Sequence, residues 1–401
     1  MKRAILGAIV VLRLAVFASQ GWASPAAGHW VVTDVAAQAR LEFPGYTDVA
    51  LVGMTPGGRV IWTAQRPGQS QWDREVFQWQ SGKIVDLGPL PRHSLPQGFN
   101  AGGAIVGSSQ DPPYCPSFGP GAPDCHPGPG HAYLWQPGKT TLLPTLGGPS
   151  SGAAAINDRG QIVGVSQTPN EQTHGVLWQN GTLTDLGAGY PWAINDRGQV
   201  LEDVTVKKGY ETVLWQGGKA TPIKLPSRDF EVRALNDRGQ VLGDFTKTNA
   251  YPHAFVWHDG KVTDLGPTFG GYPMAINDRG DVVVPQQGWE NASRGVLWRN
   301  GKKIVLGSLG GPETFPAALN ERDEVVGIST LRGSTFENPD THAFFWQNGK
   351  MTMLPSDGAV LYYEAPMAID PAGTLVAGGT GPFECDQNGC DGELLVWQYR
   401  R

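Results

Sequence analysis

The chain has 401 residues, of which only 17% are charged, and it is rich in Gly (55) and Pro (32). This composition favours many short strands joined by tight turns over a helical protein, and no long stretch keeps a 3.6-residue apolar period. The formal net charge of −6 excludes the basic surface that nucleic acid or anionic lipid requires, so we expect no nucleic-acid partner.

Residues 1–23 are typical of an export signal. They have a basic start, an apolar middle and small residues before a cleavage point after Ala23. Arg13 interrupts the apolar part, and no later run is apolar and long enough to span a bilayer. Removing the segment takes away three bases (Lys2, Arg3 and Arg13) and no acid, so the net charge of −6 becomes −9. We expect an exported protein, periplasmic or extracellular, whose mature chain has no membrane span.

From residue 29 to residue 399 the chain repeats one unit eight times. The first half of the unit is clearest in AAAINDRGQIVGVS and VRALNDRGQVLGDF, and the second half in HGVLWQNGTLTDLG and HAFVWHDGKVTDLG. Successive units are about 37–56 residues long, a period typical of repeat architectures. An apolar triplet in every unit ends in a tryptophan: Trp79, Trp135, Trp178, Trp215, Trp257, Trp298, Trp346 and Trp397.

Turn chemistry makes each half-unit a β-hairpin. In INDRGQ the Asn and Asp side chains can bond backbone groups ahead of them, and the Gly supplies a positive φ. In WQNGT and WHDGK the Asn-Gly or Asp-Gly pair is a strong hairpin signal. Each unit therefore has four strands, which we name A (before INDRG), B (after it), C (ending in Trp) and D (as in KVTDLG). Eight such sheets bury both their faces when arranged radially, which predicts an all-β, eight-bladed β-propeller in a single domain.

The two ends of the chain predict a closed ring. The last unit has strands A, B and C and stops at ELLVWQYRR without a strand D. The missing strand matches the segment WVVTDVA at 30–36, with Val32 aligned on Val262 of KVTDLG. Because a bare edge strand is a liability, we expect the N-terminal strand to complete the last blade.

The four cysteines form two local pairs. Cys115 and Cys125 lie in one loop, and Cys385 and Cys390 lie in another. In an exported chain such pairs are most simply two disulfides, each closing its own loop. The alternative is a Cys/His metal site with His126 or His131, but the pairs lack C-x-x-C spacing. We therefore expect no metal and no cofactor.

The combination HAFVW, DGKVTDLG and AINDRG resembles the extracellular HAF-type repeat family. The tripeptide itself occurs at His253-Ala254-Phe255 and at His342-Ala343-Phe344, and other units carry looser versions. The resemblance covers nearly all of the mature chain. It implies secretion and β-repeats, and it implies no defined activity.

Loop length distinguishes the two faces of the expected ring. The A–B and C–D turns are uniformly tight, whereas the B–C and D–A connections on the other face vary and hold both cysteine pairs. Variable loops on a rigid scaffold are where binding sites are usually found. Aromatic residues gather near this face, and flat rings suit a glycan or a peptide, with inter-blade packing as the alternative. The candidate ligand-binding residues are Tyr190, Trp192, Tyr272, Trp289, Phe315 and Tyr363.

Other recurrent polar residues are better explained by structure than by chemistry. A His four residues before the blade Trp (His131, His174, His253 and His342) is replaced by Glu or Arg elsewhere, so we expect it to bond backbone or a neighbouring blade. The INDRG turns supply one Asp each, followed by an Arg, which is unsuited to a cation. No nucleophile elbow, zinc motif or phosphate loop occurs.

Two functions from different classes remain. The preferred one is a secreted or periplasmic binding module that presents its loop-rich face to a glycan, a peptide or a protein partner. The alternative is a propeller-type enzyme, a lyase or hydrolase acting on a polysaccharide, with His126, Arg332 and Glu337 as conceivable contributors.

Overall fold

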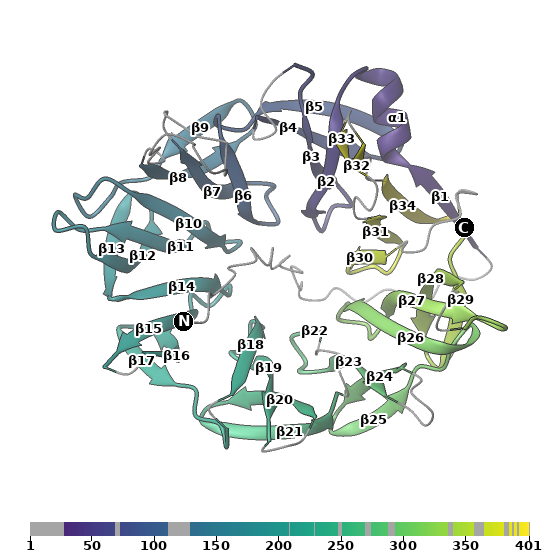
Figure 1. Cartoon of the computed structure of the whole chain (residues 1–401). Helices are drawn as coiled ribbons and strands as arrows, with labels where there is room; N and C mark the ends of the chain where they lie inside the picture. The colour runs from purple at the N-terminus through teal and green to yellow at the C-terminus, as the bar shows by residue number, and fades with distance from the viewer. Residues whose placement is uncertain are drawn as a thin grey trace.

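Eight four-stranded antiparallel sheets follow one another around a ring in the computed structural model (Figure 1). Strand A of each sheet lies nearest the centre of the ring, and strand D lies outermost. The predicted eight-bladed propeller is confirmed. The structure describes residues 28–68, 73–110, 129–207, 209–227, 229–247, 251–268, 274–287, 293–335, 340–356, 365–380, 385–386, 389–390 and 393–400.

Blades 1 to 4 use consecutive strands in the order A, B, C, D. Blade 1 has β2 (Thr47–Met54), β3 (Val60–Gln65), β4 (Arg74–Gln80) and β5 (Lys83–Pro89). Blade 2 has β6 (Ser94–Phe99), β7 (Ile105–Gln110), β8 (Gly130–Gln136) and β9 (Lys139–Leu142). Blade 3 has β10 (Ser151–Ile156), β11 (Ile162–Gln167), β12 (Thr173–Gln179) and β13 (Thr182–Gly187). Blade 4 has β14 (Gly189–Ile194), β15 (Val200–Val206), β16 (Gly209–Gln216) and β17 (Lys219–Pro222).

Blades 5 to 7 continue the pattern, and blade 8 departs from it. Blade 5 has β18 (Phe230–Leu235), β19 (Val241–Thr246), β20 (Pro252–His258) and β21 (Lys261–Pro267). Blade 6 has β22 (Ala275–Ile276), β23 (Val282–Gln287), β24 (Ser293–Arg299) and β25 (Lys302–Val305). Blade 7 has β26 (Gly310–Leu319), β27 (Val325–Leu331), β28 (Thr341–Gln347) and β29 (Lys350–Met353). Blade 8 has β30 (Ala365–Ile369), β31 (Leu375–Thr380), β34 (Glu393–Arg400) and β1 (His29–Asp34), with the small hairpin of β32 (Cys385–Asp386) and β33 (Gly389–Cys390) before β34.

The N-terminal strand closes the ring as the sequence predicts. In blade 8, β1 pairs with β34 and places Val32 opposite Trp397. In blade 5 the aligned residue, Val262, lies opposite Trp257 in the same way. The similarity to KVTDLG ends at Asp34, because this side chain accepts a hydrogen bond from the Ala37 backbone N–H and caps a short helix, α1 (Val35–Glu42).

The repeated tryptophans form the core between blades. In blades 1 to 7 each lies opposite the first residue of strand B, as Trp178 lies opposite Ile162, and in blade 8 Trp397 lies opposite the second, Val376. Side chains of neighbouring blades then share one cluster: Val106 and Ala132 of blade 2 pack with Ile162 and Trp178 of blade 3. Truncating such a buried ring costs about 3–5 kcal/mol, so the tryptophan repeat is a packing signal.

Candidate functional site

The Asn of the repeated A–B turn joins each of blades 2 to 7 to the blade that follows it. Asn157 Oδ1 accepts the backbone N–H groups of Arg159 (3.1 Å) and Gln161 (2.9 Å). Its Nδ2 donates to Gln161 Oε1 at 2.7 Å and to the backbone carbonyl of Asn195 in the next blade at 2.8 Å. The buried amide therefore uses all its donors and acceptors. Equivalent links run from Asn100 to Asn157, Asn195 to Asn236, Asn236 to Asn277, Asn277 to Asn320 and Asn320 to Asp370.

The Asp of the same turn adds a second link. The backbone N–H of Asp158 donates to Asp196 Oδ1 at 2.8 Å, and Asp196 donates in turn to Asp237 Oδ1 at 2.7 Å. Asp237 and Asp278 continue the series, which ends on Glu321 Oε1 at 2.7 Å. We call the two series the Asn–Asp ladder. In this ladder the Asn and Asp side chains of INDRG form hydrogen bonds within the turn and between blades. This agrees with the structural role expected for these turns.

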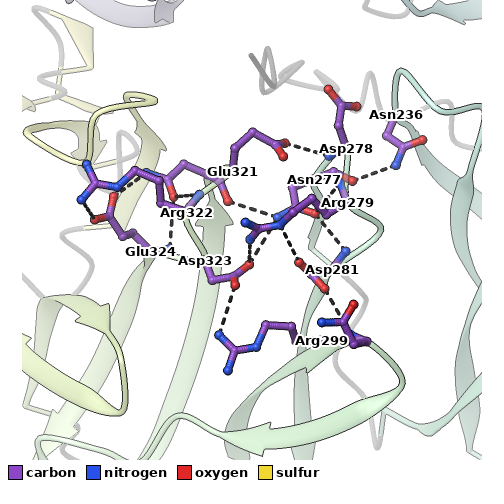
Figure 2. A network of polar contacts seen from close by, with 12 residues as sticks. Asn236, Asn277, Asp278, Arg279, Asp281, Arg299, Glu321, Arg322, Asp323 and Glu324 are labelled. Carbon is purple, nitrogen blue, oxygen red and sulfur yellow. Dashed lines mark hydrogen bonds and ion pairs between the residues drawn. The ribbon is translucent and has the colours of Figure 1, made fainter. Parts of the chain in front are cut away.

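Blades 6 and 7 carry extra acids in the ladder region (Figure 2). Asp323 stands where other turns have Gly, and it binds Arg279 of the preceding blade and Arg299 (3.2 Å). Glu324 stands where other turns have Gln, and burial raises its pKa to about 7. Because Asp323 faces two arginines and Glu324 accepts from Asn320 Nδ2 at 2.6 Å, these acids are committed to partners within the protein. Among the described residues, no group of three or more His, Cys, Asp or Glu side chains is placed to hold a metal ion.

The opposite face, which carries the B–C and D–A connections, is called the loop face below. Three of the predicted ligand-binding residues lie in the described structure, and they differ in environment. Tyr190 in β14 is 44% exposed. Trp192 lies at a β-bulge and packs half-buried against the core shared by blades 4 and 5. Phe315 in β26 is half-buried and lies opposite Ile328. The other three, Tyr272, Trp289 and Tyr363, lie outside the described residues.

Tyr190 belongs to an aromatic pair that the sequence did not reveal. Its ring meets that of Tyr210 at 6.0 Å and 72°, and Tyr210 is 66% exposed. Strand pairing places Tyr190 opposite Asp203, and Asp203 opposite Thr212, whose hydroxyl donates to Asp203 Oδ1 at 2.6 Å. Tyr210 is the second residue of β16, strand C of blade 4, so strand register was the only signal that could have placed it. We call Tyr190, Asp203, Tyr210 and Thr212 the blade 4 patch.

Charged residues occupy the equivalent strand positions of blade 5. Arg233, at the bulge of β18, donates from Nη2 to Glu231 at 2.8 Å and from Nε to Asp244. Burial raises the pKa of Asp244, and the hydrogen bond from Arg233 opposes that rise. Glu231 pairs with Asp244 across the strands as Tyr190 pairs with Asp203 in blade 4. Blade 4 thus carries a tyrosine pair and blade 5 carries an ion cluster at equivalent strand positions.

Glu202 is a buried acid that precedes Asp203 in β15 and points to the opposite face of the strand, toward blade 3. It is 1% exposed, and its Oε1 has no hydrogen-bond partner. The same strand position is Gly164 in blade 3 and Gly243 in blade 5, whereas here the carboxyl group lies against Gly175 and Gly189, whose missing side chains leave room for it. Burial, with the charges of Asp203 and Asp185, raises the pKa of Glu202 to about 7.

The recurrent histidines have a partner different from the one expected. His174 Nδ1 lies 2.9 Å from Asp185 of its own blade, and His253 Nδ1 lies 2.9 Å from Asp264. The prediction of a backbone or neighbouring-blade partner is therefore wrong for both. Because these Asp residues also accept the N–H of a positive-φ Gly two residues on, the histidine links strand C to the bulge of strand D.

The predicted disulfides and signal segment are only partly covered by the structure. The backbone pairing of β32 with β33 places Cys385 opposite Cys390. Cys115, Cys125 and residues 1–23 lie outside the described residues, as do His126 and Glu337. In the described part of the chain, no helix is apolar and long enough to cross a bilayer.

Comparison with known proteins finds distant structural similarity and no family. No protein-family model and no curated sequence matches the chain. The β-propeller domain of the Trilobed protease from Pyrococcus furiosus is similar at 10% identity and a TM-score of 0.46, over 78% of this chain and 99% of that one. A prolyl endopeptidase is similar at 12% identity and a TM-score of 0.48, over 90% of this chain and 58% of that one. TolB from Acinetobacter baumannii has 11% identity and a TM-score of 0.35, over 65% and 62%. The fold assignment therefore rests on this chain's own strand pairing.

Proposed function

We propose that the protein is an exported binding module, periplasmic or extracellular, whose loop face holds a glycan or peptide chain at blades 4 and 5. The observation that carries this proposal is the exposed pair of Tyr190 and Tyr210 beside the hydrogen-bonding groups of Asp203 and Thr212. Exposed tyrosines combine a flat apolar ring with a polar tip, which suits a sugar ring or a peptide side chain. The repeat pattern supports a place among the extracellular HAF-type proteins.

The rigidity of the scaffold supports a binding role. Strands on both sides of the patch are fixed by the Asn–Asp ladder and by the tryptophan core, so the patch is held in place before any ligand arrives. Binding then avoids much of the entropy loss that ordering a loop would require. The cysteine pairs, which we propose to be disulfides, would restrain the longer loops of the same face.

An array of immobilised glycans and peptides tests the proposal, using the chain without residues 1–23. We expect retention of a ligand without product release, and a loss of about tenfold or more for Tyr190→Ala and Tyr210→Ala, since an aromatic contact contributes about 0.5–1.5 kcal/mol beyond its buried area. Leu142→Ala is the control, because Leu142 is 59% exposed on the outermost strand of blade 2. Undiminished binding by both tyrosine variants would place the ligand elsewhere.

One observation favours the alternative of a polysaccharide lyase or hydrolase. A carboxyl group with a pKa near 7 is what general acid catalysis needs at neutral pH, and Glu202 has one, on the face of β15 opposite to the patch. Against this stands its burial, since no substrate touches a side chain that is 1% exposed without a local opening. Released products on the array, abolished by Glu202→Gln, would establish the enzyme.

A further inference from the structure

The junction between blades 8 and 1 lacks the Asn–Asp ladder for a chemical reason. In blade 8 the turn begins Asp370-Pro371, so neither the side-chain amide nor the backbone N–H that donates elsewhere is present. In blade 1 the turn begins Thr55-Pro56, so the accepting carboxylate is absent as well. At this junction blade 8 therefore lacks the hydrogen-bond donors and blade 1 lacks the carboxylate acceptor.

The arginine that crosses other junctions is also replaced here. Arg279 reaches from blade 6 to Asp323 of blade 7, and Arg322 reaches from blade 7 to the backbone carbonyl of Ala372 in blade 8. The corresponding residue of blade 8 is Ala372 itself, whose methyl group is too short to reach blade 1. Among the described residues of the two turns no polar side chain crosses the junction, and a cavity lies between the turns.

This cavity has a volume of about 280 Å³ and is built from the first and last blades. The volume is just below the range of about 300–1,000 Å³ that drug-sized ligands use, so it suits a ligand of about one ring. The cavity opens on the side of the A–B and C–D turns, opposite to the loop face. Its lining residues are Pro56, Gly57, Gly58, Trp79, Gln80, Ser81, Asp370, Thr374, Leu375, Gln398 and Tyr399.

The polar groups of the cavity suit a neutral ligand rich in hydroxyl groups. The Gln398 side chain makes no hydrogen bond within the described part of the chain, so both its donors and its acceptor are available. Gln80 donates to the carbonyl of Gly57 at 3.1 Å, which leaves its amide oxygen to accept.

The cavity offers no free charge. Asp370 is its only ionisable acid, and Oδ1 accepts the N–H groups of Thr374 (2.6 Å) and Leu375 (2.8 Å), while Oδ2 accepts the Thr374 hydroxyl at 3.0 Å. A carboxylate satisfied within its own turn adds little to the recognition of a cation. Trp79 also lines the cavity, beside these amides. We propose that the cavity between blades 8 and 1 binds one neutral sugar residue, at a site separate from the blade 4 patch.

Titration with single sugars tests the site directly. The probes are glucose, galactose, mannose, fucose and N-acetylglucosamine, added to the chain without residues 1–23 and followed by ligand-observed NMR. Two variants target the cavity. Ala372→Arg restores the crossing arginine of the repeat and should place a guanidinium group at the Gly57 carbonyl, and Gln398→Ala removes the free amide. We expect at least one sugar to bind, and each variant to weaken it about tenfold or more.

A matched control makes the same change at a junction that has its ladder. Gly102→Arg restores the repeat's arginine in blade 2, next to blade 3, and should leave sugar binding unchanged, as should Leu142→Ala on the exposed outermost strand of blade 2. Folding of every variant is checked by its melting curve. Loss of binding in Tyr190→Ala with retention in Ala372→Arg would overturn the proposal and assign the sugar to the loop face. Failure of all five sugars to bind at about 10 mM would overturn it too.

Discussion

Asn195 donates its side-chain amide to the backbone carbonyl of Asn236, 41 residues later in the next blade, at 2.8 Å. The same amide group closes its own turn by accepting the N–H groups of Arg197 and Gln199. One residue type therefore specifies both the local turn and the contact between blades. This double use explains why the repeat retains Asn at the start of its turn, where Asp or Ser could also form a local turn.

Replacing Asn195 by Ala should destabilise the ring substantially. The change removes four hydrogen bonds of a residue that is 4% exposed, and it leaves buried backbone groups of two blades without partners. Each unsatisfied buried group costs about 1–3 kcal/mol, so we expect a loss of about 2–4 kcal/mol in the free energy of unfolding. Denaturant titration measures it. Asn170→Ala, at an exposed loop residue of blade 3, is the control, and an equal effect of the two variants would show that the ladder contributes nothing.

The repeat made the architecture predictable, and the site depended on contacts that repeats do not encode. Glycine-containing turns and the tryptophan period are local signals, so strand number, blade order and the N-terminal strand followed from them. Tyr190 could be suspected as an exposed aromatic, but its partner Tyr210 comes from another strand and appears only once the register is known. Trp192 and Tyr190 look alike in sequence, and only the bulge in β14 separates a packing ring from an exposed one.

The Asn–Asp ladder also could not be predicted from the sequence. The sequence explains why INDRG turns, and it gives no sign that Asp158 bonds the next blade, because that partner lies 38 residues away. Helix α1 was missed since eight residues are too few to establish an apolar period, and its start depends on the cap formed by Asp34. The cavity between blades 8 and 1 depends on Pro56, Pro371 and Ala372. These residues come from opposite ends of the chain and lie together only in the closed ring.

Removing the N-terminal strand should destabilise the whole ring. Deleting residues 29–36 takes away the six residue pairs between β1 and β34 and exposes the edge of blade 8. We expect cooperative unfolding at a much lower temperature, because Val32 also packs in the core shared by blades 7 and 8. A synthetic peptide of residues 28–42, added in excess, should restore part of the loss, and a scrambled peptide should not. A truncated chain that melts like the intact one would contradict the closed ring.

The cysteines should be fully oxidised in the exported protein. Cys385 faces Cys390 in register, and Cys115 and Cys125 are close in sequence, so we expect two local disulfides. Peptide mapping by mass spectrometry without reduction should find these two links, and thiol titration of the denatured chain should find no free thiol. Crossed pairing between the two loops, or free thiols in material taken from the exported fraction, would refute the assignment.

Glu202 should make the protein less stable as the pH rises through neutrality. Its pKa in the folded protein is about 7, whereas an ordinary Glu in the unfolded chain titrates near 4.3. Between these values the unfolded chain releases its proton first, so the free energy of unfolding falls as the pH rises from about 4 to about 7, and it levels off above that. Glu202→Gln keeps the shape and removes the titration, so its advantage over the natural protein should grow across this range, to as much as about 3 kcal/mol at pH 8.

The quantity to measure is the difference in the free energy of unfolding between the natural protein and Glu202→Gln. Glu324 titrates in the same range and adds the same pH dependence to both proteins. Denaturant titrations of each protein at pH 5, 6, 7 and 8 provide it, with Glu171→Gln, an exposed loop residue, as the control. A difference that stays constant with pH would mean that Glu202 is ionised throughout. The carboxylate would then have a partner that the buried position between Gly175 and Gly189 does not supply, and the general-acid role considered for Glu202 would lose its basis.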